Sequence, residues 1–199
     1  MTGLDALVIA GAGKADSPRP DLFEAQTRAT IRYADPAAWI VAAAIANATA
    51  RSMELFAESA HEVGVITVSD QGPASSMAEV NAATSKGFSS PIRYAASNPG
   101  SFAGVACIAF GFRGPTLNLI MPPQDGVPVA LKLCAGWLTR RVARWMVLAT
   151  HRVIGGGTSI GRSMILGCQD LSPGIGKPFT QGDAEWLVNV DELISAFHE

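Results

Sequence analysis

The side chains in this sequence that could act as nucleophiles or metal ligands are few. Its three cysteines, Cys107, Cys134 and Cys168, lie far apart and have neither CxxC nor Cys/His spacing, so we expect no metal site and no disulfide framework. Cys107 and Cys134 fall within apolar stretches that predict buried helices, where a thiol serves as a small apolar filler. Cys168 ends an expected strand and is the one thiol that we would test as a nucleophile.

Histidines and serines add little to this inventory. His61, His151 and His198 are each expected at the surface or at the end of a strand. Ser69 lies in a polar turn after an expected strand, but no GxSxG elbow surrounds it. An acyltransferase or hydrolase that uses Cys168 or a serine such as Ser69 is therefore an alternative function without a motif behind it.

A pair of glycines near the start of the chain follows an apolar run from Leu4 to Ala10. Gly11-Ala12-Gly13 has the GxG of a phosphate loop. It lacks the third glycine, and the acidic residue about 20 positions further on, that define a dinucleotide site. We therefore interpret the apolar run as a central strand and the glycines as the turn at its end, and we expect no cofactor.

Apolar runs alternate with helical signals along the chain. Strands are predicted at Leu4–Ala10, Val63–Val68, Thr116–Met121, Trp145–Thr150 and Arg162–Cys168. Helices are predicted at Ala37–Arg51, Ser75–Ala83, Asn98 through Cys107, Val127–Val142 and, in the tail, Asp183–Phe197, with a helical or bent segment at Ser52–Ala60. This alternation indicates an α/β fold.

Two of these helices are expected to be buried. Asp35-Pro36 begins the helix Ala37–Arg51, which is apolar on nearly every face, as is typical of a helix packed between layers. Asn98-Pro99 begins the second, where small residues from Gly100 to Cys107 predict the close approach of another element.

The composition limits the partners. Hydrophobic residues make up 48% and charged residues 16% of the 199 residues, which is apolar for a soluble monomer and predicts a surface buried against another protein. The net charge of −2 gives no electrostatic footprint for nucleic acid or an anionic membrane. No apolar run reaches the roughly 18 residues of a membrane helix, and the start does not match a signal peptide. We expect a soluble, cytoplasmic protein.

The stretch Ser90–Gly126 contains a buried helix, an FGxxGP turn, a strand, the sharp turn Pro122–Gly126 and the start of a helix. Its matching residues are Ser90-Pro91, Asn98, Ala103-Gly104, Ile108, Phe110-Gly111, Arg113-Gly114-Pro115 and Gly126. In this order the stretch resembles the amino-terminal half of the β-ketoacyl synthases, members of the thiolase-like superfamily, and the resemblance extends weakly over Leu4–Val153. It implies one ketosynthase-like domain over residues 1–199 without the family's carboxyl-terminal half. The implied fold is α/β, a thiolase-like half with a mixed five-stranded sheet and helices on both faces.

Ketosynthases bind the acyl chain on a cysteine at the end of the strand after Gly-Pro, where the start of the next helix lowers the thiol pKa. Counting from Gly114-Pro115 places Pro123 at that position and Gln124 beside it. The family's two catalytic histidines belong to the missing half, and none of the histidines here lies in its HGT-type setting. The resemblance therefore implies a noncatalytic chain, similar to the chain length factors of type II polyketide synthases, which lack the cysteine and often carry glutamine there.

A chain length factor-like subunit implies a heterodimer with a full-length ketosynthase, in highly reducing, polyene-type type II polyketide or fatty-acyl biosynthesis. The resemblance implies that one strand pairs across the dimer axis; its residues are Thr116, Leu117, Asn118, Leu119, Ile120 and Met121. It also implies that Gln71, in the turn after the second strand, and Arg93 and Tyr94, in a loop at Pro91–Ala96, shape the acyl tunnel.

An acyl carrier protein would reach this complex. Arg140, Arg141 and Arg144 are candidates for docking an acidic carrier protein. The alternative, which we favour, is that these cations complement the carboxyl end of the helix Val127–Val142.

Overall fold

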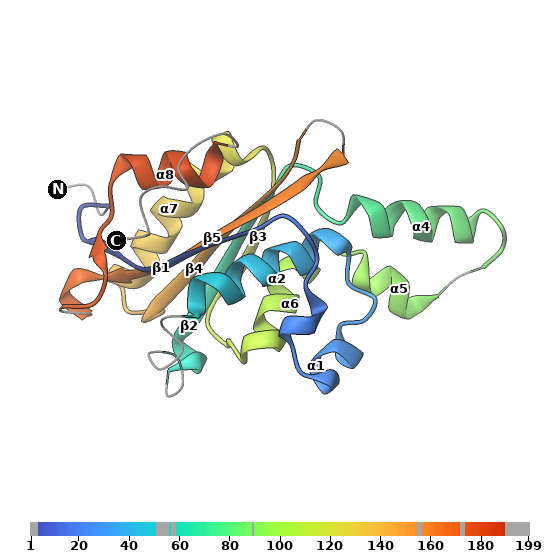
Figure 1. Ribbon diagram of the computed structural model, residues 1–199, viewed down its shortest axis with the longest axis horizontal. Coiled ribbons are helices and arrows are strands. Elements are labelled where there is room, and N and C mark those ends of the chain that lie inside the picture. The colour runs from blue at the N-terminus through green and yellow to red at the C-terminus, as the bar shows by residue number, and fades with distance from the viewer. Residues whose placement is uncertain are drawn as a thin grey trace.

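The computed structural model describes residues 4–50, 56, 59–88, 90–154, 157–171 and 174–189. In this part of the chain a mixed six-stranded sheet has the order β3-β2-β4-β5-β1-β6 (Figure 1). The strands are β1 (Leu7–Ala15), β2 (Val63–Ser69), β3 (Thr116–Ile120), β4 (Trp145–Val153), β5 (Ser159–Cys168) and β6 (Lys177–Pro178). β3, β2 and β4 are parallel, and β5 runs antiparallel to both β4 and β1. The predicted mixed sheet is confirmed, with six strands instead of five because the short β6 pairs with β1.

Helices cover both faces of this sheet (Figure 1). One face packs against α2 (Pro36–Thr49) and α6 (Ser101–Phe110), and the other against α7 (Pro123–Thr139) and α8 (Gln181–Val188). Every residue of β2 is buried, since both of its faces are covered. This explains why β2 reads in the sequence as an unbroken apolar run instead of an alternating one.

The two glycines of Gly11-Ala12-Gly13 lie inside β1, so the predicted turn at this position is wrong. Helix α2 crosses β1 so closely that a Cβ on Gly11 would collide with the backbone of Ala48, and one on Gly13 with that of Ala44. The glycines therefore serve helix–sheet packing, because only a residue without a side chain fits under α2.

Helix α2 begins as predicted. The Asp35 carboxylate caps it by accepting a hydrogen bond from the Ala37 N–H at 2.9 Å, and Pro36 takes the first helical position. Its residues are almost all buried, which confirms the predicted central helix.

Helix α6 begins at Ser101, three residues later than predicted, and Asn98 instead accepts the N–H of Gly100 at 2.8 Å. The helix ends as expected at Gly111, which has a left-handed φ of 70°. Its burial is one-sided: nothing lies within 4 Å of a Cβ placed on Gly104, and Ile108 is half exposed. One face of the helix packs in the core beside α2, as predicted for a buried helix with a partner element, but the opposite face, with Gly104 and Ile108, is not buried.

A helical hairpin projects from one end of the molecule (Figure 1). It consists of α4 (Ala74–Thr84) and α5 (Pro91–Ala96), and we call residues 74–96 the arm. Residues 91–96 were expected to form a loop, but they are helical. Neither helix of the arm contains a buried residue, so the arm touches the body without being enclosed by it.

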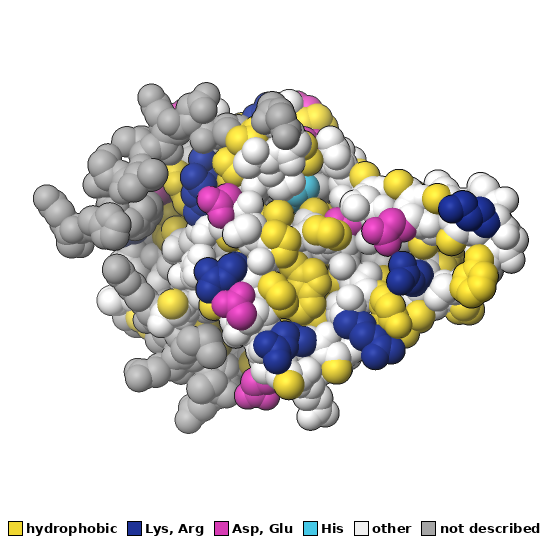
Figure 2. All heavy atoms as spheres, turned by 45° about the vertical axis from the view of Figure 1, so that its right-hand side comes forward, with side chains coloured by type: hydrophobic (Ala, Val, Ile, Leu, Met, Phe, Trp, Pro, Cys, Tyr) yellow, Lys and Arg dark blue, Asp and Glu magenta, His cyan; other side chains and the backbone are white. Residues whose placement is uncertain are grey.

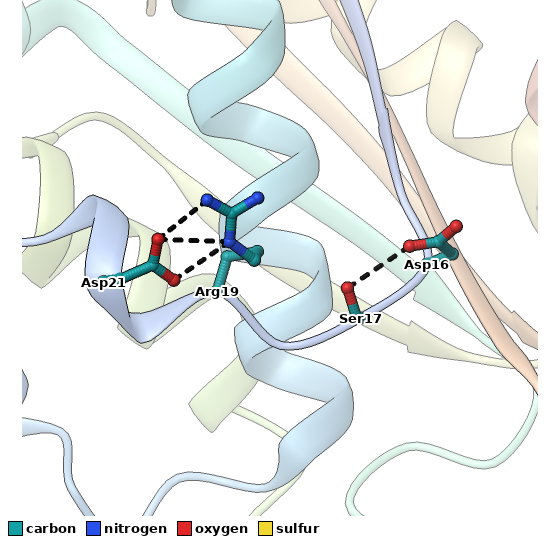
Figure 3. Close-up of polar contacts among 4 residues, drawn as sticks. All are labelled: Asp16, Ser17, Arg19 and Asp21. Atoms are coloured by element: carbon teal, nitrogen blue, oxygen red, sulfur yellow. Dashed lines mark hydrogen bonds and ion pairs between the residues drawn. The ribbon is translucent and has the colours of Figure 1, made fainter.

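Shorter elements complete the described chain: η1 (Pro20–Leu22), α1 (Ala25–Thr30), η2 (Ala60–Glu62) and η4 (Gln169–Leu171). The segment after β1 makes local polar contacts, in which Arg19 binds Asp21 and Ser17 donates to Asp16 (Figure 3). The hydrogen bond from Arg19 lowers the pKa of the exposed Asp21 carboxyl group.

Two predicted segments fall largely outside the described residues. These are the segment Ser52–Ala60 and the part of the tail helix after Asn189. The described part of the tail forms α8, which begins with a capping box of Thr180 and Asp183. None of the helices in the described part of the chain has the length and hydropathy that a bilayer-spanning segment requires.

Candidate functional site

Several of the candidate residues lie around the carboxyl ends of the parallel strands. Ser69, the last residue of β2, pairs with Ile120 of β3 on one side and with His151 of β4 on the other. Two connections leave this edge: the turn at residues 70–73, which leads into the arm, and the short link from β3 into α7. Ligand sites in α/β proteins commonly form at such an edge.

Pro123 is the first residue of α7 and is buried. The predicted tight turn at Pro122–Gly126 is therefore shorter than expected, because the helix has already begun. Gly126 permits this arrangement, since a Cβ there would collide with Val68 of β2. The position next to the free amides of the helix start holds a proline ring, which can neither attack an acyl group nor donate a hydrogen bond.

Gln124 follows Pro123 but is exposed. It lines a groove of about 500 Å³ between α7 and α8, together with apolar residues that include Leu131 and Phe179. Both residues lie in the first turn of α7. Pro123, at the position predicted for the nucleophile, is buried, whereas Gln124 faces solvent.

Strand β3 is an edge strand of the sheet. One side of it pairs with β2, and among the described residues no strand pairs with the other side. Asn118 fixes β3 in place: its side-chain oxygen accepts the hydroxyl of Thr67 at 2.6 Å and the N–H of Ala103, in α6, at 3.0 Å. Ile120, at the end of the strand, is 44% exposed. The edge predicted for pairing is therefore well ordered by its neighbours and open on one side.

The turn after β2 is organised by a buried pair of polar side chains. Ser69 Oγ lies 3.0 Å from His151 Nδ1 and accepts the N–H of Gly72 at 2.9 Å. Gly72 lies against Ile120, since a Cβ built on it would lie 3.0 Å from the Ile120 Cδ1 atom. Gln71, the residue before Gly72, is exposed within this turn.

His151 lies near the carboxyl end of β4, which agrees with the strand-end alternative, but it is buried, so the surface alternative is wrong for this histidine. Its ring packs edge-to-face against Phe102, with ring centroids 5.9 Å apart. Burial lowers the pKa of His151, and the negative charges of Asp70 and Asp35 only partly oppose this shift. Among the described residues, neither His151 Nε2 nor Asp70 Oδ1 has a hydrogen-bond partner.

The Ser69–His151 pair has the contact of a nucleophile and its base, which the sequence did not reveal. The residues lie 82 positions apart and meet only through the register of β2 and β4. Both are almost fully buried, with exposures of 1% and 2%, so a substrate cannot reach Ser69 in this conformation. The geometry supports a structural link between β2, β4 and the turn.

Arg93 and Tyr94 lie on α5 of the arm and differ in their contacts. Arg93 lies 3.3 Å from Glu79 of α4, and its guanidinium lies 5.5 Å from the ring centroid of Tyr33 in the body. Tyr94 is 71% exposed. The structure therefore engages Arg93 within the chain and leaves Tyr94 available to another molecule.

The three arginines after α7 lie at the opposite end of the sheet from Pro123, because α7 begins after β3 and ends before β4. Arg140 donates through Nε to the carbonyl of Gly136 at 2.9 Å, as expected for a cation that complements a helix end. Arg141 has a left-handed φ of 56° in the turn that follows, and Arg144 is exposed. This placement supports the helix-end interpretation.

None of the cysteines fits a reactive thiol. Burial raises the pKa of Cys107 to about 11 and that of Cys134 to about 12. Cys168 ends β5 as predicted, but it is buried with 4% exposure. Within the described ranges, no group of three or more His, Cys, Asp or Glu residues could hold a metal ion.

No family model and no curated protein matches this sequence. Solved structures do match. Ketosynthase twelve from the bacillaene polyketide synthase of Bacillus amyloliquefaciens superposes with a TM-score of 0.64 at 9% identity, over 85% of this chain and 42% of that chain. The fold is therefore ketosynthase-like, that is, a thiolase-like half, as the sequence resemblance implied.

Two further matches are complexes. The ishigamide ketosynthase/chain length factor has a TM-score of 0.59 at 11% identity, over 84% of this chain and 63% of that chain. The ketosynthase ApeO in complex with its chain length factor ApeC, from Xenorhabdus doucetiae, has a TM-score of 0.57 at 12% identity. The match covers 82% of this chain and 79% of that chain. This chain thus spans less than two thirds of the bacillaene and ishigamide chains, whereas the chain matched in the Xenorhabdus complex is close to it in length.

A structural role for His151 predicts a pH-dependent stability. Because the pKa of His151 in the folded protein lies below the ordinary histidine value of about 6.5, the unfolded chain binds the proton more tightly. Above that pH the titration of His151 does not reduce the free energy of unfolding. As the pH drops from about 6.5 toward the pKa of the folded state, the free energy of unfolding falls by at most about 1.4 kcal/mol per pH unit. Chemical denaturation at a series of pH values should show this slope in the wild type.

The variant His151→Gln should lose stability at neutral pH and should also lose this part of the pH slope. His61→Gln, at an exposed position in η2, is the matched control and should keep the wild-type slope. An unchanged slope in His151→Gln would show that other groups cause the acid sensitivity.

Proposed function

We propose that this protein is a noncatalytic, chain length factor-like subunit that pairs with a ketosynthase and shapes the tunnel for its acyl chain. The observation that carries this proposal is Pro123, buried at the start of α7 in a ketosynthase-like fold. The resemblance places the nucleophilic cysteine at this residue, and a proline cannot replace it. A partner subunit must then supply the chemistry.

The open edge of β3 supports pairing with such a partner. An unpaired strand edge offers a row of backbone donors and acceptors to a second strand, and proteins rarely leave one uncovered. We infer that Thr116–Met121 forms the centre of the interface. The hydrogen bonds of Asn118 to Thr67 and Ala103 support this. Because they already order β3 in the free chain, the strand would lose little conformational entropy when a partner binds.

The arm supplies a second surface for the partner. Its exposed apolar side chains are Met77, Phe88, Ile92 and Tyr94, of which Phe88 is 72% exposed. Figure 2 shows the arm extending from the body with hydrophobic and basic side chains on its surface. Large apolar groups exposed together typically mark an interaction site.

We assign the tunnel to the side of the interface where the turn and the arm lie. Tyr94 is free to reach across the interface, and Gln71 lies in the turn next to Ile120. Arg93 is a weaker candidate than the sequence implied, because Glu79 and Tyr33 already bind it. A bulky residue at the end of a tunnel limits the length of the chain it can hold.

The wider setting of the proposal is highly reducing, polyene-type type II polyketide or fatty-acyl biosynthesis in the cytoplasm. The match of similar length, a ketosynthase in complex with its chain length factor, supports the pairing with a ketosynthase, whereas the polyene type and the cytoplasmic location rest on the sequence alone. An acyl carrier protein would deliver substrates to the complex. Docking of that carrier at Arg140, Arg141 and Arg144 has little support, since these residues lie at the far end of α7.

A stand-alone acyltransferase or hydrolase is the second candidate. The Ser69–His151 contact of 3.0 Å favours it. Against it, both residues are buried, and Ser69 Oγ already accepts the N–H of Gly72. Cys168 is buried as well, so we rank this function second.

Pairing through β3 predicts that a charge at its exposed end blocks the complex. Ile120→Asp should weaken association with a co-expressed full-length ketosynthase by tenfold or more, because burying an unpaired carboxylate costs more than about 1.4 kcal/mol. Association is measured by co-purification and by analytical ultracentrifugation of the purified chains.

Val129→Asp is the control, since Val129 is also 44% exposed but lies on α7. It should leave association unchanged. Equal binding by both variants, with each shown to be folded, would exclude β3 as the interface.

A tunnel closed by Tyr94 predicts longer products when this side chain is shortened. Tyr94→Ala should let the tunnel bury one more two-carbon unit, worth about 0.8 kcal/mol per methylene, and so shift the ratio of product lengths by roughly tenfold. The measurement is the product distribution of the reconstituted pair at matched complex stability. Phe88→Ala, at an equally exposed position on the arm, should leave the distribution unchanged; the same distribution for Tyr94→Ala would remove Tyr94 from the tunnel.

A further inference from the structure

A small pocket lies where the arm joins the body. It has a volume of about 240 Å³ and is lined by Arg32 and Tyr33, which precede α2, and by Ser76, Glu79 and Arg93 of the arm. We propose that this pocket binds a phosphate group. The site is separate from the strand edge and from the start of α7.

The charge in the pocket is unbalanced. The Arg32 guanidinium lies 4.7 Å from the centroid of the Tyr33 ring, and the Arg93 guanidinium lies 5.5 Å from the same centroid. Only Arg93 has a carboxylate partner, Glu79 at 3.3 Å. Within the described residues no ion pair is formed by Arg32, so the lining carries two cations and one anion.

The negative charge of a further carboxylate, that of Asp35, lies close to Ser76 but outside the lining. Asp35 is buried and directs its two oxygens at backbone amides: Oδ1 accepts the N–H of Ala37, and Oδ2 accepts the N–H of Ser76 at 2.8 Å. Among the described residues Asp35 forms no ion pair with Arg32 or Arg93, so an anion bound in the pocket would pair with the two guanidinium groups beside the Tyr33 ring.

The geometry suits a phosphate better than a simple monovalent ion. A guanidinium presents its N–H donors in a planar fork that matches phosphate oxygens, and stacking on Tyr33 holds that plane. The hydroxyl groups of Tyr33 and Ser76 belong to the lining side chains and are further donors.

The residues that would bind the phosphate come from two parts of the molecule, so binding would connect these two parts. Arg32 and Tyr33 belong to the body, whereas Ser76 and Arg93 belong to the arm, whose helices bury no residue of their own. A phosphate held between them would fix the orientation of the arm. If the arm contacts a ketosynthase, phosphate binding would also strengthen that contact, and this consequence alone depends on the proposed function.

Two sources could supply the group: a free phosphorylated metabolite, or the phosphate that links a carrier protein to its pantetheine arm. The shared chemistry is the phosphate. Isothermal titration calorimetry of the full chain at constant ionic strength can separate the sources, with inorganic phosphate, 4′-phosphopantetheine and unphosphorylated pantetheine as probes.

Both phosphate probes should bind and pantetheine should not. Arg32→Gln should weaken phosphate binding by tenfold or more, whereas Arg28→Gln, at an exposed arginine of α1 outside the pocket, should leave it unchanged. Much tighter binding of 4′-phosphopantetheine than of inorganic phosphate would identify the carrier arm as the source, and equal binding would identify a free anion.

Absence of phosphate binding, or equal loss of binding in both variants, would overturn the proposal. Circular dichroism of each variant shows whether it is folded, and both replaced side chains are exposed. The result is independent of the proposed function, because association with a ketosynthase is measured separately with Ile120→Asp.

Discussion

The pairing of β3 on one side only is the constraint on which the rest of this structure depends. Hydrogen bonds to β2 hold one side of the strand, and Asn118 ties it to Thr67 and to the start of α6. Both faces of the sheet are covered by helices, and within the described chain the edge of β3 offers backbone groups to another strand. A partner that adds a strand there would complete the sheet without rearranging the core.

The carboxyl ends of the parallel strands link this edge to the arm. Ser69 and His151 join β2 to β4 and also hold the turn at Gly72, which lies against Ile120. Asp35 caps α2 and at the same time accepts an N–H from the first turn of α4. The orientation of the arm therefore depends on buried polar contacts at its root and on the arginine–tyrosine contacts beside them. A single end of the molecule combines the end of β3, the buried Pro123 at the start of α7 and the exposed arm.

Much of this fold could be predicted from the sequence. Strands β2, β3 and β4 are apolar runs bounded by turn residues, and Asp35-Pro36 is a strong helix start, so local signals sufficed. The glycines of β1 were misassigned because their reason is tertiary: α2 crosses them at close range.

The candidate site was harder to predict than the fold. His151 lies in a strand buried on both faces, where the sequence has no alternation to show which side a residue occupies. Its contact with Ser69 depends on strand register, and the contacts of Tyr33 with Arg93 join segments 60 residues apart in the chain. The assignment of Pro123 to the nucleophile position by counting from Gly114-Pro115 stays a prediction, whereas its place at the buried start of α7 is seen in the structure.

Hydrogen–deuterium exchange of this chain, alone and mixed with a full-length ketosynthase, tests the central claim most directly. We expect a stable complex in which the backbone amides of residues 116–120 exchange much more slowly than in the free chain, because the open side of β3 becomes hydrogen-bonded, with added protection on the arm at residues 74–96. Failure to form a complex, or a complex in which exchange at β3 is unchanged, would contradict the account.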